Sequence, residues 1–282
     1  MNIASKHAQI VDHVVDLPTG PVFYRDSGGE GVPMVFLHAA SGSSLMWQHQ
    51  IPAFTQAGYR CVAIDYRGVD GKNGLFDWSD QIDALVTKLA LPRFHLLGTA
   101  AGGGAAFQYA LAFESKVRSL VVANSHGNVT DREYVEMGKR TRPSPQFDQL
   151  PLEFRELGPS YRAADADGVA RWLALSAANP GADAAARAPA SGELAGSQPL
   201  AADRFALTPR RAVTWSKLEK LKVPTLIVTG DADLYMPPSV LRMFVEHIRH
   251  AESEVIAETG HSSYWENPEP FNRAVLAFLR KH

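Results

Sequence analysis

Short hydrophobic runs rich in Val and Ile alternate along this chain with stretches whose hydrophobic residues recur at helical spacing. The runs predict buried strands and the stretches predict amphipathic helices. The predicted strands cover residues 34–38, 61–66, 94–98, 119–123, 225–229 and 254–257. The predicted helices cover residues 45–56, 78–89, 101–113, 238–247 and 270–279. This alternation is typical of an α/β fold with a mostly parallel central sheet flanked by helices.

The N-terminal part of the pattern differs from the rest. Two strand-like segments, 9–17 and 21–26, are separated only by Pro18, Thr19 and Gly20. Such a short link between strands allows only an antiparallel pairing. We therefore expect a hairpin at one edge of the sheet.

A long interruption of the strand pattern divides the chain. Between about residues 125 and 222 no strand is predicted, whereas 165–177 carries hydrophobic residues on one helical face. Residues 130–133 read Thr-Asp-Arg-Glu, the pattern of a capping box at a helix start. Residues 180–202 are rich in Ala, Gly, Pro and Ser, which favours a flexible loop.

This interruption sets the expected domain organisation. Residues 1–125 and 215–282 should form one core domain, and residues 126–214 should form a helical cap inserted between two strands. We call residues 126–214 the cap segment. Its position between neighbouring strands predicts that it lies above the strand ends as a lid.

Composition and charge narrow the possible partners. The 282 residues are 45% hydrophobic and 21% charged, as in ordinary globular proteins, and the net charge is −2. No basic run is present, which argues against nucleic acid or a membrane as a partner. The first 15 residues contain charged residues and lack the apolar core of a signal peptide. With a single cysteine, Cys61, no disulfide can form within the chain, and a cytoplasmic location is expected.

The segment 94–104 carries the most informative motif. It reads Phe-His-Leu-Leu-Gly-Thr-Ala-Ala-Gly-Gly-Gly, a predicted strand that passes through a small-residue turn into a helix. It resembles the nucleophile elbow of the α/β-hydrolase superfamily, in which Gly98 and Gly102 would allow strand and helix to pack closely. In this alignment the nucleophile position is Ala100, where the family usually has serine.

Two segments that precede this motif in the chain also resemble segments of the same family. The loop His38-Ala39-Ala40 resembles the family's His-Gly loop, and backbone N–H groups of Ala39 or Ala40, with that of Ala101, would form an oxyanion hole. The turn at 65–68, Asp-Tyr-Arg-Gly, matches a turn that we interpret as structural.

The last two matching loops supply the acid and the histidine. Gly230-Asp231-Ala232-Asp233 resembles the acid loop, where the spacing from Gly230 favours Asp233 over Asp231. Gly260-His261 resembles the histidine loop. The chain order of nucleophile position, acid and histidine is that of the α/β-hydrolase fold.

An alanine at the elbow leaves three explanations open. Ala100 has neither a proton to give nor a lone pair with which to attack, so no acyl-enzyme forms by the usual route. The alanine is an engineered replacement of serine, or it belongs to a natural enzyme. In the natural enzyme, a His261–Asp233 pair would act as a general base in cofactor-free oxygenase, lyase or hydratase-like chemistry. The third explanation is a non-catalytic binding protein on an enzyme scaffold.

Aromatic and small residues are predicted to line the cleft. The candidate substrate-binding residues are His38, Trp47, His126, Trp172, Tyr235, Tyr264 and Trp265. A mostly apolar pocket suits an aromatic or alicyclic carbonyl compound. The resemblance implies hydrolysis of an ester, a lactone or a carbon–carbon bond in such a small molecule. No metal-binding cluster, phosphate loop or dinucleotide motif is present, so no cofactor is expected. The oligomeric state is left open, a homodimer included.

Overall fold

The computed structural model describes residues 10–18, 20–65, 78–178 and 211–282. The predicted turn at 66–68 and most of the Ala/Gly/Pro/Ser-rich stretch at 180–202 lie outside the described residues. The remaining motifs of the sequence all fall within them.

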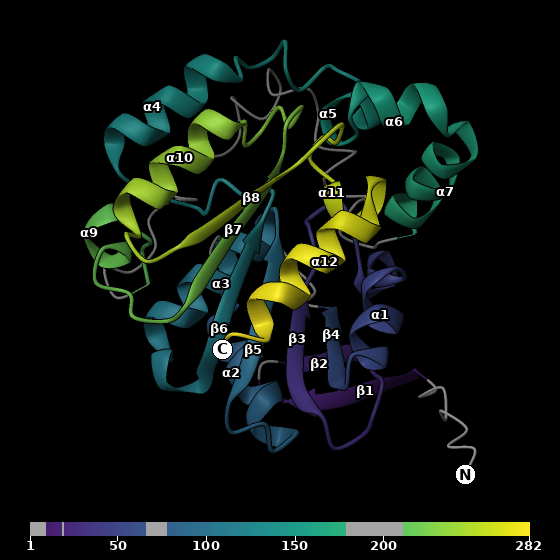
Figure 1. Cartoon of the computed structure of the whole chain (residues 1–282), viewed down its shortest axis with the longest axis vertical. Coiled ribbons are helices and arrows are strands. Elements are labelled where there is room, and N and C mark those ends of the chain that lie inside the picture. The colour runs from purple at the N-terminus through teal and green to yellow at the C-terminus, as the bar shows by residue number, and fades with distance from the viewer. Residues whose placement is uncertain (1–9, 19, 66–77, 179–210) are drawn as a thin grey trace.

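A central sheet of eight strands organises the fold (Figure 1). The strands are β1 (Val11–Leu17), β2 (Gly20–Asp26), β3 (Val32–Leu37), β4 (Tyr59–Asp65), β5 (Phe94–Thr99), β6 (Val117–Ala123), β7 (Thr225–Gly230) and β8 (Glu252–Ile256). Their order across the sheet is β1-β2-β4-β3-β5-β6-β7-β8. The hairpin β1–β2 is antiparallel and forms one edge, as predicted, and β2 is also antiparallel to β4. All further pairs are parallel.

Helices cover both faces of this sheet and confirm the predicted α/β class (Figure 1). In the core they are η1 (Ser44–Trp47), α1 (Gln50–Gln56), α2 (Ser79–Lys88), α3 (Ala101–Ala112), η2 (Glu114–Lys116), α9 (Trp215–Leu218), α10 (Pro238–His247), α11 (Ser263–Glu266) and α12 (Pro268–Leu279). The cap segment contributes α4 (Arg132–Thr141), α5 (Leu152–Glu156), α6 (Pro159–Ala164) and α7 (Ala166–Ala177).

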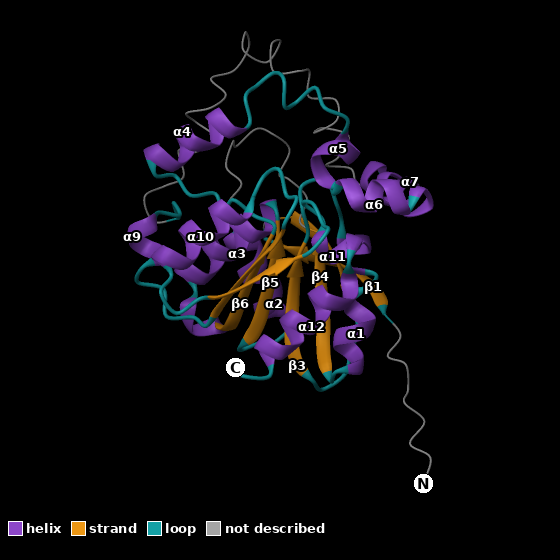
Figure 2. Ribbon diagram, turned by 45° about the horizontal axis from the view of Figure 1, so that its top comes forward, coloured by secondary structure: helices purple, strands orange, loops and turns teal. Residues whose placement is uncertain are grey.

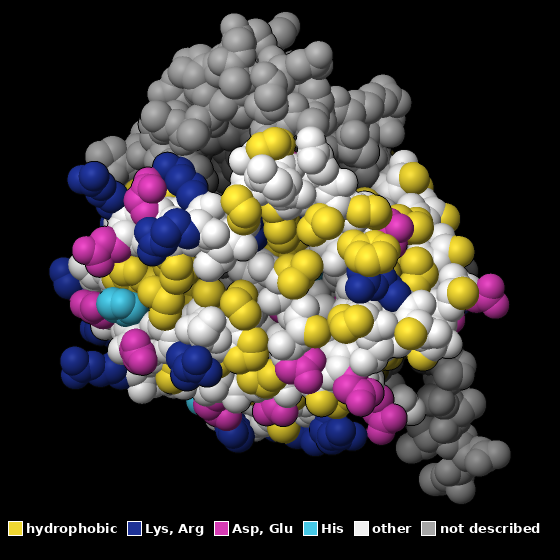
Figure 3. Space-filling model, turned by 90° about the horizontal axis from the view of Figure 1, so that it is seen from above, with side chains coloured by type: hydrophobic (Ala, Val, Ile, Leu, Met, Phe, Trp, Pro, Cys, Tyr) yellow, Lys and Arg dark blue, Asp and Glu magenta, His cyan; other side chains and the backbone are white. Residues whose placement is uncertain are grey.

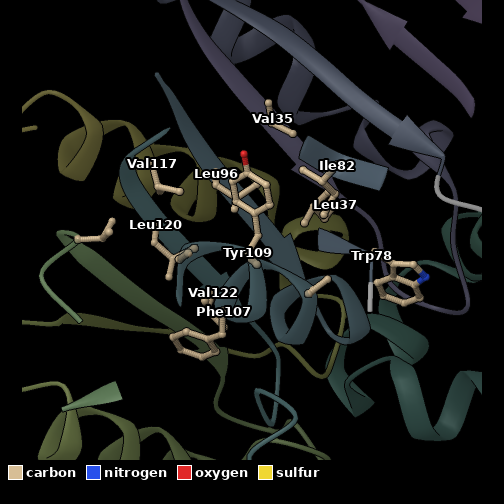
Figure 4. Close-up of a cluster of buried hydrophobic side chains, with 14 of the residues drawn as sticks. Val35, Leu37, Trp78, Ile82, Leu96, Phe107, Tyr109, Val117, Leu120 and Val122 are labelled. Atoms are coloured by element: carbon tan, nitrogen blue, oxygen red, sulfur yellow. The ribbon is translucent and has the colours of Figure 1, made fainter. Parts of the chain in front are cut away.

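Two hydrophobic cores lie on opposite faces of the sheet, because successive side chains of a strand point to opposite sides. In β3, Val35 and Leu37 join the core under α2, α3 and α10, whereas Met34 and Phe36 join the core under α1 and α12. Figure 4 shows part of the first core, in which Phe107 of α3 is among the side chains gathered against the sheet. The parallel strands are therefore buried on both sides, which explains their continuous hydrophobic runs.

The described part of the cap segment is helical and lies beyond the carboxyl ends of the strands (Figure 2). Figure 3 looks down on this end of the molecule, where hydrophobic side chains spread across the visible face. The exposed hydrophobic residues include Leu150 and Phe154 of the cap segment and Leu234 of the loop after β7. That the cap segment is a separate domain stays a prediction.

Three local predictions are wrong in detail. The helix predicted at 45–56 is divided into η1 and α1. The strand predicted at 254–257 is not buried, because β8 is the last strand of the sheet and Val255 is 41% exposed.

The predicted capping box is the third difference. Helix α4 begins after Asp131, and no side chain caps it. The Thr130 hydroxyl instead donates to the Val213 carbonyl, and the Asp131 carboxylate accepts the Trp215 N–H. Both polar side chains therefore bind the returning chain, a long-range partner that the four-residue pattern does not reveal.

Candidate active site

The elbow places Ala100 in a strained backbone conformation. Between β5 and α3 this residue has φ +50° and ψ −116°, which a non-glycine residue adopts at a cost of about 1–3 kcal/mol. Glycines on either side make the turn possible, since a Cβ on Gly98 would collide with the Gly102 carbonyl. A Cβ on Gly102 would collide with the carbonyls of Leu37 and His38. The beginning of α3 therefore packs directly against the end of β3.

Asp233 and His261 form a buried pair at the ends of β7 and β8. Nδ1 of His261 donates to Asp233, at 2.9 Å from each carboxylate oxygen, and the two residues are 4% and 2% exposed. Asp231, the alternative acid, is exposed, and its carboxylate accepts the Thr259 N–H. Since Nδ1 carries the proton, Nε2 of His261 has its lone pair, and no hydrogen bond to it is present in the described residues.

Close backbone packing brings the histidine loop to the acid. A Cβ on Gly230 would collide with the carbonyls of Thr259 and Gly260, so β7 and the histidine loop approach in a way that only glycine permits. Beyond Gly230, the backbone N–H groups of Tyr235 and Met236 donate to Oδ1 of Asp233 at 2.8 and 3.0 Å. The carboxylate is thereby fixed on several sides.

Asn124 and Ser125, at the end of β6, join the elbow to this pair. The Ser125 hydroxyl donates to the Ala100 carbonyl at 2.5 Å. The Asn124 amide donates to Asp233 and to the Gly260 carbonyl, each at 3.1 Å. Neither residue was predicted from the sequence, because a polar side chain after a strand is usually exposed to water.

The predicted oxyanion donors lie where the elbow meets the loop after β3. Ala101 begins α3, whose N-terminus has no side-chain cap, so the positive end of the helix dipole lies at this turn. Ala39 is buried and Ala40 is exposed. His38 is 4% exposed, its Nδ1 is 2.7 Å from the Ala39 carbonyl, and its Nε2 is 3.7 Å from Asp65. These contacts hold the His38 ring against its own loop and Asp65, and its contact with a substrate stays a prediction.

The charges of the pair shift its pKa values in opposite directions. Burial raises the pKa of Asp233, but the charge and hydrogen bond of His261, with donors from Met236 and Asn124, outweigh burial and lower it. Burial lowers the pKa of His261, but the Asp233 carboxylate and then Glu156 outweigh burial and raise it above 6.5. This arrangement stabilises an imidazolium, as a proton-accepting histidine requires.

The predicted substrate-binding residues fall into two groups. Trp47, Trp172, Tyr264 and Trp265 are at most 2% exposed and belong to one hydrophobic core. Their contact with a substrate stays a prediction. The second group consists of His126 and Tyr235, which are half-buried and lie nearer the His261–Asp233 pair. Burial, Arg142 and His261 lower the pKa of His126 to about 4, so His126 is neutral at pH 7.

Tyr235 lies against the imidazole itself. The ring centroids of Tyr235 and His261 are 4.2 Å apart, with an interplanar angle of 34°. Glu156, at the end of α5, is 7% exposed, and burial raises the pKa of its carboxyl. The sequence analysis did not single out Glu156, which looks like any helix glutamate in the sequence.

Glu266 connects the histidine loop to the cap segment. Its carboxylate accepts backbone N–H groups of Gly260 at 3.0 Å, Ser262 at 3.1 Å and Gly158 at 2.7 Å. Burial raises its pKa to about 7, although these three donors oppose the shift. Nothing in the sequence distinguished Glu266 from a surface residue.

We expect Glu266→Ala to lower the free energy of unfolding by about 3 kcal/mol, because three backbone N–H groups would lose their acceptor. Urea denaturation followed by circular dichroism measures the change. The matched control is Glu269→Ala in α12, whose side chain is 88% exposed and whose loss should change the free energy by less than about 0.5 kcal/mol. Equal effects of the two variants would contradict the role of Glu266.

A strained strand–turn–helix junction, with an acid and a histidine delivered by later strand ends, defines the class of proteins with the α/β-hydrolase fold. The chain belongs to the alpha/beta hydrolase fold family, whose sequence model matches residues 32–268. The match spans both parts of the core and the cap segment between them. The chain is thus a member of this family, and the assignment of Ala100 to the nucleophile position stays a prediction.

Individual relatives extend over almost the whole chain. A 2-hydroxy-6-oxononadienedioate/2-hydroxy-6-oxononatrienedioate hydrolase of Burkholderia vietnamiensis (strain G4 / LMG 22486) is 26% identical over 98% of this chain and 96% of its own. A second hydrolase with this description, numbered 2 in Pseudomonas putida, is 27% identical over 98% of this chain and 96% of its own. The crystal structure of the enol-lactonase from Burkholderia xenovorans LB400 has a TM-score of 0.73, with 17% identity over 95% of this chain and 100% of that one. The last likeness concerns the fold.

Within the described residues, no helix is long and apolar enough to cross a bilayer. No group of three or more His, Cys, Asp or Glu side chains in the same part of the chain is arranged to hold a metal ion.

Proposed function

We propose that this chain hydrolyses a small, largely apolar carbonyl compound, at an ester, a lactone or a carbon–carbon bond, with His261 as general base. The observation that carries the proposal is the buried His261–Asp233 hydrogen bond, which leaves Nε2 of His261 available as a proton acceptor. Ala100 offers no nucleophile, so water is the group that the base activates. We place that water beside the Ala100 methyl, where a serine hydroxyl would otherwise lie.

The steps follow from these groups. Nε2 of His261 takes a proton from water as the water oxygen bonds to the substrate carbonyl carbon. The carbonyl oxygen becomes negative and accepts the N–H of Ala101 and that of Ala39 or Ala40, where each well-placed donor is worth about 3 kcal/mol. The tetrahedral intermediate then breaks its bond to the leaving carbon or oxygen, which takes the electron pair. The imidazolium of His261 returns the proton to it.

The relatives support the substrate class. The proteins from Burkholderia vietnamiensis and Pseudomonas putida are described as hydrolases of oxononadienedioates, compounds that carry carboxylates and a carbonyl group. Two cations of the cap segment act on groups of the site. Arg142 opposes the rise in the pKa of His261, and Arg155 opposes the rise in the pKa of Glu156. Nε of Arg155 is buried without a hydrogen-bond partner in the described residues. We propose that these arginines receive a substrate carboxylate.

The test is an assay of the purified protein on a panel of aryl esters, lactones and dienoic keto acids. We expect turnover without an acyl-enzyme mass, because Ala100 cannot be acylated. The rate should rise with pH, with a midpoint above the ordinary imidazole value of 6.5, because His261 accepts a proton only when neutral and its pKa is raised. His126, with a pKa of about 4, does not titrate in this range.

Two results would contradict the proposal. One is a covalent adduct on the unchanged protein, which would require a nucleophile other than residue 100. The other is a pH profile that is flat between pH 5 and 9 while turnover persists, which would exclude His261 as the base. Absence of turnover on the whole panel, together with tight binding of a panel compound, would favour the binding-protein explanation instead.

A further inference from the structure

The amide of Asn124 is buried between the acid and the histidine loop. Its Nδ2 donates to Oδ2 of Asp233 and to the Gly260 carbonyl, each at 3.1 Å. Its Oδ1 accepts the Ser263 hydroxyl at 2.5 Å. Asn124 and Ser263 are both 0% exposed. Both N–H groups and the oxygen of this amide are therefore used inside the protein.

These partners fix which end of the amide faces the acid. The Asp233 carboxylate and the Gly260 carbonyl can only accept hydrogen bonds, whereas the Ser263 hydroxyl can donate one. A reversed amide would place its oxygen 3.1 Å from two other oxygens that carry negative charge. The orientation of the Asn124 amide is thus determined by the acid and the histidine loop together.

Oδ2 of Asp233 has two side-chain donors besides His261. The Thr229 hydroxyl lies 3.4 Å from this oxygen, but the same hydroxyl donates to the Met236 carbonyl at 2.5 Å. Because a hydroxyl has one proton, little of it is left for the carboxylate. The Asn124 amide, at 3.1 Å, is the stronger of the two donors.

Backbone conformation alone does not explain this asparagine. Asn124 has φ +46°, in the left-handed region that asparagine tolerates better than most residues, and its N–H donates to the Val228 carbonyl at 2.8 Å. Glycine would meet this backbone requirement equally well. It would, however, leave Asp233 and the Gly260 carbonyl without their donor. The hydrogen bonds of the amide are therefore a separate property of the position.

We propose that Asn124 is a positioning residue, which acts on His261 by holding the Asp233 carboxylate against the histidine loop. Two of its contacts, Gly260 and Ser263, lie on either side of His261 in the sequence, and the third is the acid itself. A movement of the loop away from Asp233 would break these hydrogen bonds along with the Nδ1 contact. The inference rests on the proposed function for its kinetic tests, but not for its spectroscopic one.

Other charged and titratable groups act on the pair and stay unchanged in every variant below. Glu156 in α5 and Glu266 in α11 interact with Asp233. Arg142 after α4 and His126 after β6 interact with His261. Differences between the variants therefore report on residue 124.

Three variants separate the amide from the backbone. Asn124→Gly keeps the left-handed backbone and removes the amide. Asn124→Asp keeps the size of the side chain but places a carboxyl group against Asp233. The matched control is Asn128→Gly, which removes an amide at φ +52° in the same loop. The Asn128 amide lies against Gly104 of α3, where a Cβ would collide with it.

The first measurement needs no substrate. Removing a donor from Asp233 without any movement would make the carboxylate more basic and raise the pKa of His261. If Asn124 positions the acid, its loss lets carboxylate and imidazole move apart, which lowers the pKa of His261 toward 6.5. We expect this lowering in Asn124→Gly, measured by NMR titration of the histidine-labelled full chain, and no change in Asn128→Gly. A raised or unchanged pKa of His261 in Asn124→Gly would overturn the proposal.

The second measurement uses any substrate found for the chain. Asn124→Gly should lower kcat about tenfold and change KM by less than about twofold, while Asn128→Gly changes neither. In a protein that already carries Asp233→Asn, the same substitution should lower kcat by less than about twofold, because Asn124 acts through Asp233. A full tenfold loss in that background would show an independent effect and overturn the proposal.

Asn124→Asp adds a pH signature that a loss of folding would not produce. Two carboxyl groups at the 3.1 Å separation of the present contact share one proton, and the protonated one can donate as the amide does. At higher pH this proton is lost and the two carboxylates repel each other. We expect kcat of this variant to rise and then fall with pH, whereas the unchanged protein reaches a plateau. A plateau in both proteins would contradict the positioning role.

The measurements separate this inference from the proposed function. If no substrate is turned over but the pKa of His261 falls in Asn124→Gly, the positioning role stands and the proposed reaction fails. If turnover depends on His261 but neither its pKa nor kcat responds to Asn124→Gly, the reaction stands and the positioning role is overturned.

Discussion

Replacing Ala100 with serine should produce a protein that forms an acyl-enzyme with activated aryl esters. The serine hydroxyl would enter the strained elbow position, beside a base whose Nδ1 is already held by Asp233 and near the capless N-terminus of α3. Losing the nucleophile of a triad typically costs on the order of 10⁴- to 10⁶-fold in rate, so the gain for activated esters should be correspondingly large. Stopped-flow measurement of a burst and the intact mass of the adduct provide the readout.

The control for this prediction is the double variant Ala100→Ser with His261→Gln, which should lose both burst and adduct. Thr99 does not interfere, because its hydroxyl is fully buried in β5. If Ala100→Ser gives no adduct, the elbow and the pair are not arranged for attack on a carbonyl, and the site assigned here is wrong. A small gain, with full activity of the alanine protein on its own substrate, would show that the site serves direct attack by water.

Replacing His261 with alanine should reduce turnover by the alanine-100 protein on the order of 10²- to 10⁴-fold, the usual contribution of a general base. The loss should appear in kcat, because the imidazole acts on water in the transition state. Since Asp233 would then be buried without its partner, Asp233→Asn combined with His261→Gln keeps the site uncharged and serves as a second test.

The matched control is His247→Gln. This histidine lies on α10, stacks on Trp215 and pairs with Glu219 at the surface, so its loss should leave turnover unchanged. If removing His261 has no effect on turnover, and Ala100→Ser gives no burst, both enzymatic explanations fail. A ligand-binding protein on a hydrolase scaffold would then remain.

Local features of the sequence were enough to predict the backbone elements that carry the site. The elbow is encoded within a few residues, because Gly98 and Gly102 permit a backbone approach that no other residue allows. The choice of Asp233 rests on spacing along the chain, and the hydrogen bond to His261 agrees with it. The parallel strands could be located in the sequence because strands buried on both faces are continuous hydrophobic runs.

Only the tertiary structure decided which polar side chains surround the elbow and the His261–Asp233 pair. Asn124, Ser125 and Glu266 bind partners that are distant in sequence, as when Asn124 reaches Asp233 across 109 positions. No local pattern marks such residues, since a polar side chain after a strand or in a helix is usually exposed to water. Even Tyr235, which was expected to touch a substrate, lies on the imidazole because the residue after α4 and the acid loop meet there. Periodicity and glycine positions determine which backbone elements form, whereas the packing of those elements determines which side chains lose water and so must find one another.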